Sequence, residues 1–117
     1  MTLPATITTQ VELDHAFAES GGRPVVIFKN SGRCGISAHA YQSYRDLVAA
    51  RAVPDALFTV IEVPEARGVS DELAARTGIR HETPQIIALR NGAAIWFASH
   101  WDVSPEALQR ALGDDAA

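Results

Sequence analysis

The sequence has very little cysteine, since Cys34 is the only one in 117 residues. A single cysteine cannot form an internal disulfide, which fits a protein kept in a reducing compartment. No apolar run approaches the roughly 20 residues that are needed to span a bilayer. Residues 1–6 lack the basic segment and the apolar core of a signal peptide. We therefore expect a cytoplasmic protein with no membrane partner.

Positive charge is also scarce. The formal net charge is −4, with 10 Lys and Arg residues against 14 Asp and Glu residues. This acidic balance argues against nucleic acid and against an anionic membrane as binding partners. The sequence has no glycine-rich phosphate-binding loop, and its histidines and carboxylates do not form a spaced set of metal ligands. We expect neither a metal site nor a tightly bound cofactor.

What the sequence does contain is sufficient for a folded domain. Hydrophobic residues make up 47% of the chain, enough for a core, and charged residues make up 21%. The length of 117 residues indicates a single domain over residues 1–117. Residues 113–117, Gly-Asp-Asp-Ala-Ala, are small or acidic, and we expect them to form a flexible tail.

Hydrophobic periodicity, capping residues and breakers predict the secondary structure. In the first half we expect a helix after Thr9 that stops at Gly21, a buried strand over 24–28 ended by Asn30, Ser31 and Gly32, a helix from Cys34 to before Pro54, and a strand over 56–61. In the second half we expect a short helix opened by Ser70 and ended by Gly78, a strand over 83–90, an Asn91-Gly92 turn, a return strand over 93–98, and a helix from Ser104-Pro105.

This order of elements predicts an α/β fold. Two early strands that flank a helix should be parallel, and the last two strands should form an antiparallel hairpin. A central mixed sheet of four to five strands follows, with helices on both faces. Reactive groups in such sheets lie just past the carboxyl end of a strand. Cys34 has this position, because it follows Phe28 by six residues and starts the next helix.

The position of Cys34 favours the thiolate. Free backbone N–H groups and the dipole at a helix N-terminus can lower a thiol pKa from about 8.5 to roughly 3.5–7.5. Arg33 adds a neighbouring positive charge, and the hydroxyl of Ser37, one turn on, can donate to the sulfur. The thiolate is the nucleophile in thiol–disulfide exchange, so we expect Cys34 to be reactive. The alternative is a small buried side chain without reactivity.

Ser37 stands where a dithiol enzyme would have its resolving cysteine. A hydroxyl is not a useful nucleophile toward disulfide sulfur at neutral pH, so Cys34 can attack once and must then wait for an external thiol. A small-molecule thiol is the natural resolver. The substrate that suits this chemistry is a protein capped by such a thiol, with Cys34 taking the cap over.

Thr83 and Pro84 form a second candidate feature, at the start of a predicted strand. Proline cannot donate a hydrogen bond to a sheet. If the Thr83–Pro84 bond is cis, the turn exposes the Thr83 backbone beside the cysteine loop, where an extended substrate can pair with it. The alternative is an ordinary trans proline at the start of a strand, which is the common case.

The order of elements and three segments resemble a known family. Nearly the whole chain resembles the thioredoxin fold. More narrowly, FKNSGRCGISAHA, TPQIIALRNG and FASHWDVS are similar to the monothiol bacilliredoxins of the YtxJ type, a family of the bacillithiol system. The resemblance implies a cytoplasmic thiol–disulfide oxidoreductase that removes bacillithiol, or a similar low-molecular-weight thiol, from protein mixed disulfides. It implies Cys34 as the nucleophile and Pro84 as the cis-proline.

The implied partners are S-thiolated proteins, with bacillithiol or a glutathione-like thiol as co-substrate. Two alternatives stay open. Residues 34–37, Cys-Gly-Ile-Ser, resemble the Cys-Gly-Phe-Ser motif of monothiol glutaredoxins, which bind an iron–sulfur cluster with an external thiol. Those proteins have a Gly-Gly pair after the hairpin, where this chain has Ala-Ser-His-Trp at 98–101. The other alternative is a non-catalytic thioredoxin-like binding module, which would not turn over a capped substrate.

Three histidines and a tryptophan are weaker candidates. His81 precedes the Thr-Pro pair, is expected at the rim of the site, and could protonate a leaving thiol. His100 and Trp101 follow the last strand, and Trp101 could form an apolar wall for the thiol or the substrate, or pack on the last helix. His39 lies on the cysteine-bearing helix and is expected to be a surface histidine.

Overall fold

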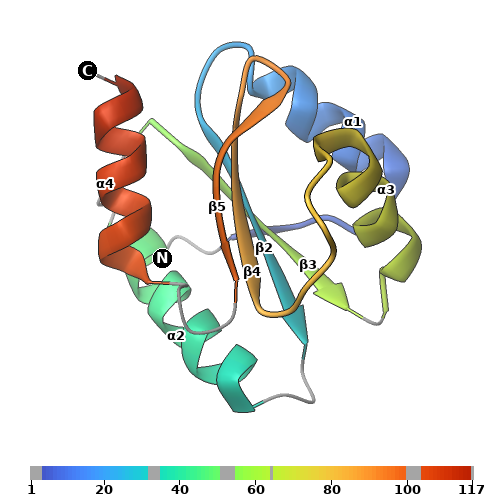
Figure 1. Cartoon of the computed structure of the whole chain (residues 1–117), viewed down its shortest axis with the longest axis horizontal. Coiled ribbons are helices and arrows are strands. Elements are labelled where there is room, and N and C mark those ends of the chain that lie inside the picture. Colours follow the sequence, from blue (N-terminus) through green and yellow to red (C-terminus); the bar gives the residue numbers. More distant parts are fainter. Residues whose placement is uncertain (1–3, 32–34, 51–54, 64, 100–103, 117) are drawn as a thin grey trace.

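The computed structural model describes residues 4–31, 35–50, 55–63, 65–99 and 104–116 (Figure 1). Its elements follow in the order β1 (Ala5–Thr6), α1 (Gln10–Glu19), β2 (Val25–Ser31), α2 (Gly35–Ala49), β3 (Leu57–Val63), α3 (Arg67–Thr77), β4 (Gln85–Arg90), β5 (Ala93–Ser99) and α4 (Pro105–Ala116). Strands and helices alternate as far as β4, and a hairpin and a last helix follow.

The strands form one mixed sheet in the order β1-β3-β2-β4-β5. The central strand β2 is parallel to β3, with Val25 opposite Leu57, and antiparallel to β4, with Ile27 opposite Ile87. Strands β4 and β5 form the antiparallel hairpin. The strand pair β2–β3 is parallel because α2 carries the chain back between the two strands. The predicted α/β fold with a mixed sheet is therefore confirmed.

Helices cover both faces of this sheet. Figure 1 shows α1 and α3 on one side and α2 and α4 on the other. Successive residues of β2 point to opposite faces. Val26 and Phe28 pack in the core beneath α2 and α4, whereas Val25 and Ile27 pack in the core beneath α1 and α3. All four side chains are fully buried, which explains why this strand is a continuous apolar run in the sequence.

The local capping and turn predictions are confirmed. The Thr9 hydroxyl accepts a hydrogen bond from the Glu12 backbone N–H, and the Glu12 carboxylate accepts one from the Thr9 backbone N–H, at 3.2 and 3.1 Å. Asn91 and Gly92 have positive φ angles of 55° and 77°, as a tight two-residue hairpin requires. Ser104 accepts a backbone hydrogen bond at the start of α4. These features depend on neighbouring residues alone.

The end of β2 and the start of α3 differ most from the predicted boundaries. Strand β2 continues through Asn30 and Ser31, because both residues pair with β3. Helix α3 begins at Arg67 rather than at Ser70, which lies buried inside the helix. Its predicted end is correct, since Gly78 forms the C-terminal cap with a φ of 73°. Both errors concern polar residues that favour turns or helix caps in an isolated segment. Here Asn30 and Ser31 pair with a neighbouring strand, and Ser70 is buried.

The two ends of the chain also hold elements beyond the prediction. Strand β1 has only two residues and pairs in parallel with β3. Helix α4 continues to Ala116, so that residues 113–116, predicted as a tail, belong to a helix. Within the part of the chain that the structure describes, no helix combines the length and the apolar character needed to cross a bilayer.

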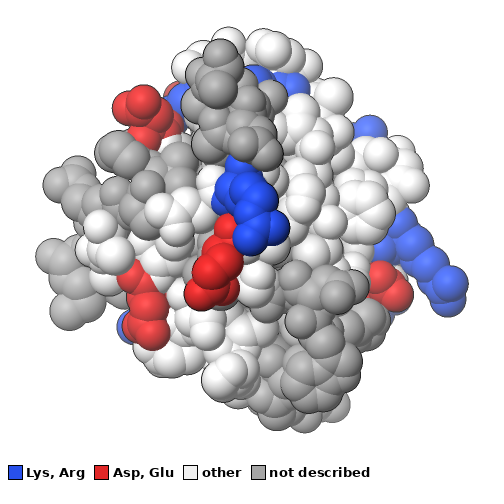
Figure 2. Space-filling model, turned by 60° about the vertical axis from the view of Figure 1, so that its left-hand side comes forward, with Lys and Arg blue, Asp and Glu red and all other residues white. Residues whose placement is uncertain are grey.

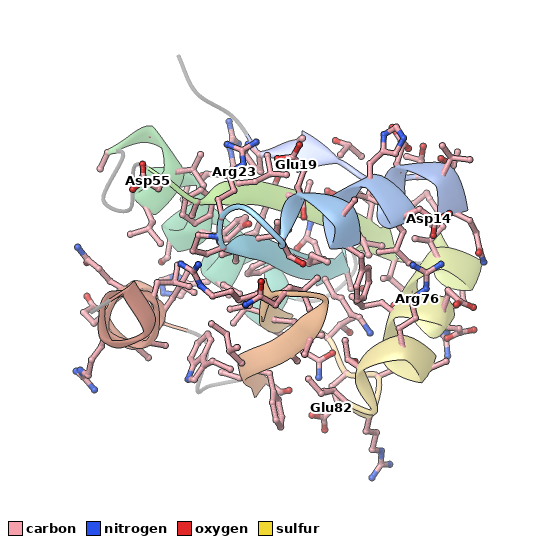
Figure 3. The ribbon with its side chains drawn as sticks, turned by 90° about the horizontal axis from the view of Figure 1, so that it is seen from above. Asp14, Glu19, Arg23, Asp55, Arg76 and Glu82 are labelled. Carbon is pink, nitrogen blue, oxygen red and sulfur yellow. The ribbon has the colours of Figure 1, made fainter. Side chains whose placement is uncertain are left out.

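Charged side chains occur in small groups of both signs. Figure 2 shows basic and acidic side chains next to each other on the face turned forward there. On α3, the Arg76 guanidinium donates hydrogen bonds to Glu72 of the same helix and to Asp14 of α1. Figure 3 shows Asp14 and Arg76 turned toward each other. This ion pair joins the two helices that cover one face of the sheet.

Candidate active site

The end of β2 and the start of α2 bracket the cysteine in the sequence. Strand β2 ends at Ser31, and α2 begins at Gly35, which is bonded directly to Cys34. Cys34 and Arg33 lie outside the described residues, so the activation of the thiol stays a prediction. The backbone of Ser37 lies in the first turn of α2. The order of a central strand, the cysteine and a helix is the one that the sequence predicted.

Thr83 and Pro84 come to the same edge of the sheet. Gln85, the residue after Pro84, lies opposite Lys29 near the end of β2. Because β2 and β4 are antiparallel, the chain before Gln85 continues alongside the end of β2, toward the segment that holds Cys34. The Thr83–Pro84 bond is cis, as predicted, and Pro84 is buried. Contact between Pro84 and the cysteine loop stays a prediction.

Gln85 holds the two stretches of chain that border this edge. Its side chain is fully buried, and its amide nitrogen donates to the Arg80 carbonyl at 2.9 Å and to the Ser99 hydroxyl at 3.1 Å. Arg80 lies on the segment that leads into β4, and Ser99 is the last residue of β5. One side chain therefore joins the segment of the Thr-Pro pair to the end of the edge strand.

Lys29 is a residue of this region that the sequence reasoning missed. It is the only lysine of the chain, and its side chain is fully buried. Its Nζ donates to the Ser70 carbonyl in α3 at 3.3 Å and lies 3.3 Å from Nδ1 of His81. Burial lowers the pKa of Lys29 to about 8, while the Asp71 carboxylate opposes and the Arg67 guanidinium reinforces this shift. The sequence signal that could have identified Lys29 is its place directly after the apolar run over 24–28, because a charged side chain in a buried strand needs polar partners.

His81 lies half-buried on the segment between α3 and β4, and the Ser70 hydroxyl is 3.0 Å from its Nδ1. Burial, first, and the positive charge of Lys29, second, lower the pKa of His81; the carboxylates of Asp71 and Glu82 oppose the shift. Figure 3 labels Glu82, the next residue of this segment. The lowered pKa favours the neutral ring at pH 7. The role of His81 as a proton donor to a leaving thiol stays a prediction.

Tyr44 fixes α2 on the sheet. Its ring packs on Phe28 of β2 with 4.9 Å between the ring centroids. Its hydroxyl donates to the carbonyl of Thr59 in β3 at 2.8 Å. The helix that begins directly after Cys34 is thereby attached to both parallel strands, which sets the position of its N-terminus relative to the end of β2.

The remaining predicted residues do not add to the described site. His39 is exposed on α2, as expected of a surface histidine. His100 and Trp101 lie outside the described residues, so their contacts with a substrate stay predictions. Among the residues that the structure describes, no three His, Cys, Asp or Glu side chains are grouped to hold a metal ion.

Comparison with known families identifies this arrangement. Residues 5–108 match the family described as monothiol bacilliredoxin BrxC. The match covers most of the chain and includes Cys34 and Pro84. The chain belongs to the monothiol bacilliredoxin BrxC family. The bacilliredoxin resemblance of the three sequence segments is therefore confirmed, and bacilliredoxin is favoured over the monothiol-glutaredoxin interpretation.

Solved structures agree with this family. One protein proposed to be an oxidoreductase with a thioredoxin fold is 27% identical, covers 93% of each chain and has a TM-score of 0.83. Thioredoxin from Malassezia sympodialis is 20% identical over 100% of this chain and 94% of that chain, with a TM-score of 0.79. Oxidised thioredoxin from Plasmodium falciparum is 18% identical over 97% and 99%, with a TM-score of 0.73. The bacilliredoxin has the thioredoxin fold and is a thiol oxidoreductase.

Proposed function

We propose that this protein removes bacillithiol, or a similar low-molecular-weight thiol, from protein mixed disulfides through Cys34. The observation that carries the proposal is a lone cysteine, placed between β2 and α2, in a chain of the monothiol bacilliredoxin family. The lone cysteine supports the chemistry because a chain with no second thiol can accept one cap and cannot expel it unaided.

The reaction consists of two exchange steps. The Cys34 thiolate attacks the sulfur of the cap, the bond between the cap and the substrate protein breaks, and the substrate sulfur leaves with the electron pair as a thiolate. A second molecule of the small thiol, as its thiolate, then attacks the cap sulfur of the mixed disulfide on Cys34. This releases the Cys34 thiolate and a disulfide of the small thiol. The helix N-terminus next to Cys34 favours the thiolate in both steps.

The partners of the reaction follow from its chemistry. The substrates are S-thiolated proteins, and the small thiol is a co-substrate rather than a bound cofactor. Thr83 and Pro84, at the edge where β4 begins, are proposed to border the substrate chain, with Arg33 and Ser37 beside the sulfur. Because the second step consumes a free small thiol, we propose the reducing cytoplasm as the compartment.

A turnover assay with two caps tests this function. A carrier protein with one cysteine is capped with bacillithiol or with glutathione, and catalytic amounts of the bacilliredoxin are added together with the matching free thiol. We expect release of the carrier thiol by the wild type, faster for the bacillithiol cap, and none above background by Cys34→Ser. Equal release by the wild type and Cys34→Ser would contradict the function. Equal rates for both caps would contradict the selection of bacillithiol.

A further inference from the structure

Two buried groups hold one edge of the His81 ring. Nδ1 of His81 lies 3.3 Å from Nζ of Lys29 and 3.0 Å from the hydroxyl of Ser70. Nζ of Lys29 also donates to the Ser70 carbonyl, so the three residues connect β2, α3 and the segment before β4. Lys29 and Ser70 are both 0% exposed. The Nδ1 edge of the ring therefore faces the protein interior.

The chemistry of Lys29 determines which ring nitrogen carries the hydrogen. An ammonium group has three donors and no acceptor, so the nitrogen that faces it must accept. A neutral imidazole whose Nδ1 accepts carries its hydrogen on Nε2. The Ser70 hydroxyl, which can donate or accept, is compatible with this tautomer. The ring is half-buried, and in this tautomer its hydrogen-bond donor, Nε2–H, lies on the side of the ring away from Nδ1.

Charged groups from every neighbouring element act on this ring. Lys29 from β2 and Arg67 from α3 disfavour a positive charge on His81, whereas Asp71 from α3 and Glu82 from its own segment favour one. Burial and the two cations prevail, so the pKa of His81 lies below its ordinary value. His81 is then a hydrogen-bond donor without a charge at neutral pH.

This donor lies at the edge where the exchange reaction is proposed to occur. His81 is three residues before Pro84, on the stretch that runs alongside the end of β2. Gln85 fixes the start of the same stretch through the Arg80 carbonyl.

We propose that Lys29 is a positioning residue that directs Nε2–H of His81 toward the sulfur that leaves when Cys34 takes over a cap. This inference rests on the function proposed above. In that step a bond forms between Sγ of Cys34 and the cap sulfur, and the disulfide to the substrate breaks. Its electron pair leaves on the substrate sulfur as a thiolate, which accepts the hydrogen bond from Nε2–H. This hydrogen bond matters most when the leaving thiol has a high pKa, because such thiols leave slowly.

Two probes that differ only in the leaving thiol test the proposal. Both carry 2-mercaptoethanol as the cap: one is linked to a peptide cysteine, whose pKa is near 8.5, and the other to thionitrobenzoate, which leaves readily as a thiolate. The measured quantity is the ratio of the peptide rate to the thionitrobenzoate rate. We expect His81→Asn and Lys29→Met to lower this ratio about tenfold or more, as the loss of a hydrogen bond to a charged group would.

Matched variants separate this role from a structural one. His81→Gln, whose amide nitrogen can take the place of Nε2, should recover part of the ratio. His39→Asn makes the same change at an exposed histidine of α2 and should leave the ratio unchanged. A substitution that only disturbs the fold should lower the rates with both probes equally and leave their ratio unchanged. The ¹⁵N signals of His81 should also show hydrogen on Nε2 in the wild type and a mixture of tautomers in Lys29→Met.

The outcomes distinguish this inference from the proposed function. An unchanged ratio in His81→Asn and Lys29→Met would contradict the role of these residues alone, as would a wild-type ring with its hydrogen on Nδ1. A wild type that reacts with both probes but shows no preference for bacillithiol would contradict only the selection of the cap. A wild type that reacts with neither probe would contradict both.

Discussion

Tyr44 in α2 donates its hydroxyl hydrogen to the backbone carbonyl of Thr59 in β3, at 2.8 Å. Because the side chain is buried, the pKa of Tyr44 is raised well above its ordinary value, and the hydroxyl remains a donor at alkaline pH. The contact connects the helix that starts after Cys34 with β3, the strand that follows this helix in the sequence. The position of α2 on the sheet therefore depends on an interaction between residues 15 positions apart.

Removing this hydroxyl should weaken the fold by a predictable amount. Tyr44→Phe keeps the ring against Phe28 and loses one buried hydrogen bond, so we expect the free energy of unfolding to fall by about 1 kcal/mol. Urea unfolding of wild type and variant measures this. Tyr41→Phe, at a half-buried ring of the same helix, is the control and should change the free energy less. Equal effects of the two substitutions would contradict the anchoring role of Tyr44.

Lys29 predicts a specific dependence of stability on pH. Its pKa is about 8 in the folded chain, below the ordinary value of 10.5. Between these values the unfolded chain binds more protons than the folded chain, so the contribution of Lys29 to the free energy of unfolding rises with pH. Lys29→Met lacks this contribution. We therefore compare the free energies of unfolding of the two proteins. The value for the variant minus the value for the wild type should fall by roughly 1–3 kcal/mol between pH 7.5 and 10.5.

Urea unfolding of both proteins at several pH values tests this dependence. Other titrating groups, such as tyrosines, act on both proteins and cancel in the difference. Because the chain has no other lysine, ¹³C-labelled lysine gives a single side-chain signal, whose titration reports Lys29 directly. A signal that titrates near 10.5, with a constant difference in stability, would show that Lys29 is not destabilised as an ammonium.

The contact between Lys29 and His81 also predicts how His81 titrates. Burial and the Lys29 charge hold the pKa of His81 below its ordinary value of 6.5. In Lys29→Met the charge is gone and the burial remains, so the pKa should rise toward 6.5. Proton and carbon signals of the ring, followed from pH 4 to 8, measure the shift. An identical titration in wild type and variant would contradict the contact.

The parts of the fold that depend on neighbouring residues were predicted from the sequence. The capping box of Thr9, the positive φ angles of Asn91 and Gly92, and the cap at Ser104 are set within a few positions. The apolar run of β2 also identified a strand buried on both faces. The α/β fold followed from the order of these elements. The cis bond before Pro84 was predicted from the fold context rather than from local preference.

The parts that depend on distant residues were not predicted. Asn30 and Ser31 favour turns, but pairing with β3 keeps them in a strand. Ser70 looks like a helix cap, but it lies inside α3, where its carbonyl accepts from Lys29, 41 positions away. His81 is 52 positions from Lys29. Such contacts are set by how the elements pack, and no periodicity or motif in one segment indicates them.

A second thiol at position 37 should change the product of the exchange. Ser37→Cys places a cysteine one helical turn after Cys34, where it can attack the capped sulfur and form an internal disulfide. Intact mass after treatment with bacillithiol disulfide should show a loss of two hydrogens in the variant. Ser43→Cys is the control, because six further helical residues place its thiol about 9 Å farther along the axis. Internal disulfides at equal yield in both variants would contradict a site at the start of α2.

The account depends most directly on whether Cys34 takes the cap from a substrate protein. A carrier protein with one bacillithiol-capped cysteine, mixed in equal amounts with the bacilliredoxin and without free thiol, allows only the first step. Intact mass spectrometry of both proteins should show the cap lost from the carrier and gained by the wild type, and no transfer to Cys34→Ser. A folded wild type that stays unmodified, with Cys34 free and reactive toward an alkylating reagent, would contradict the central claim.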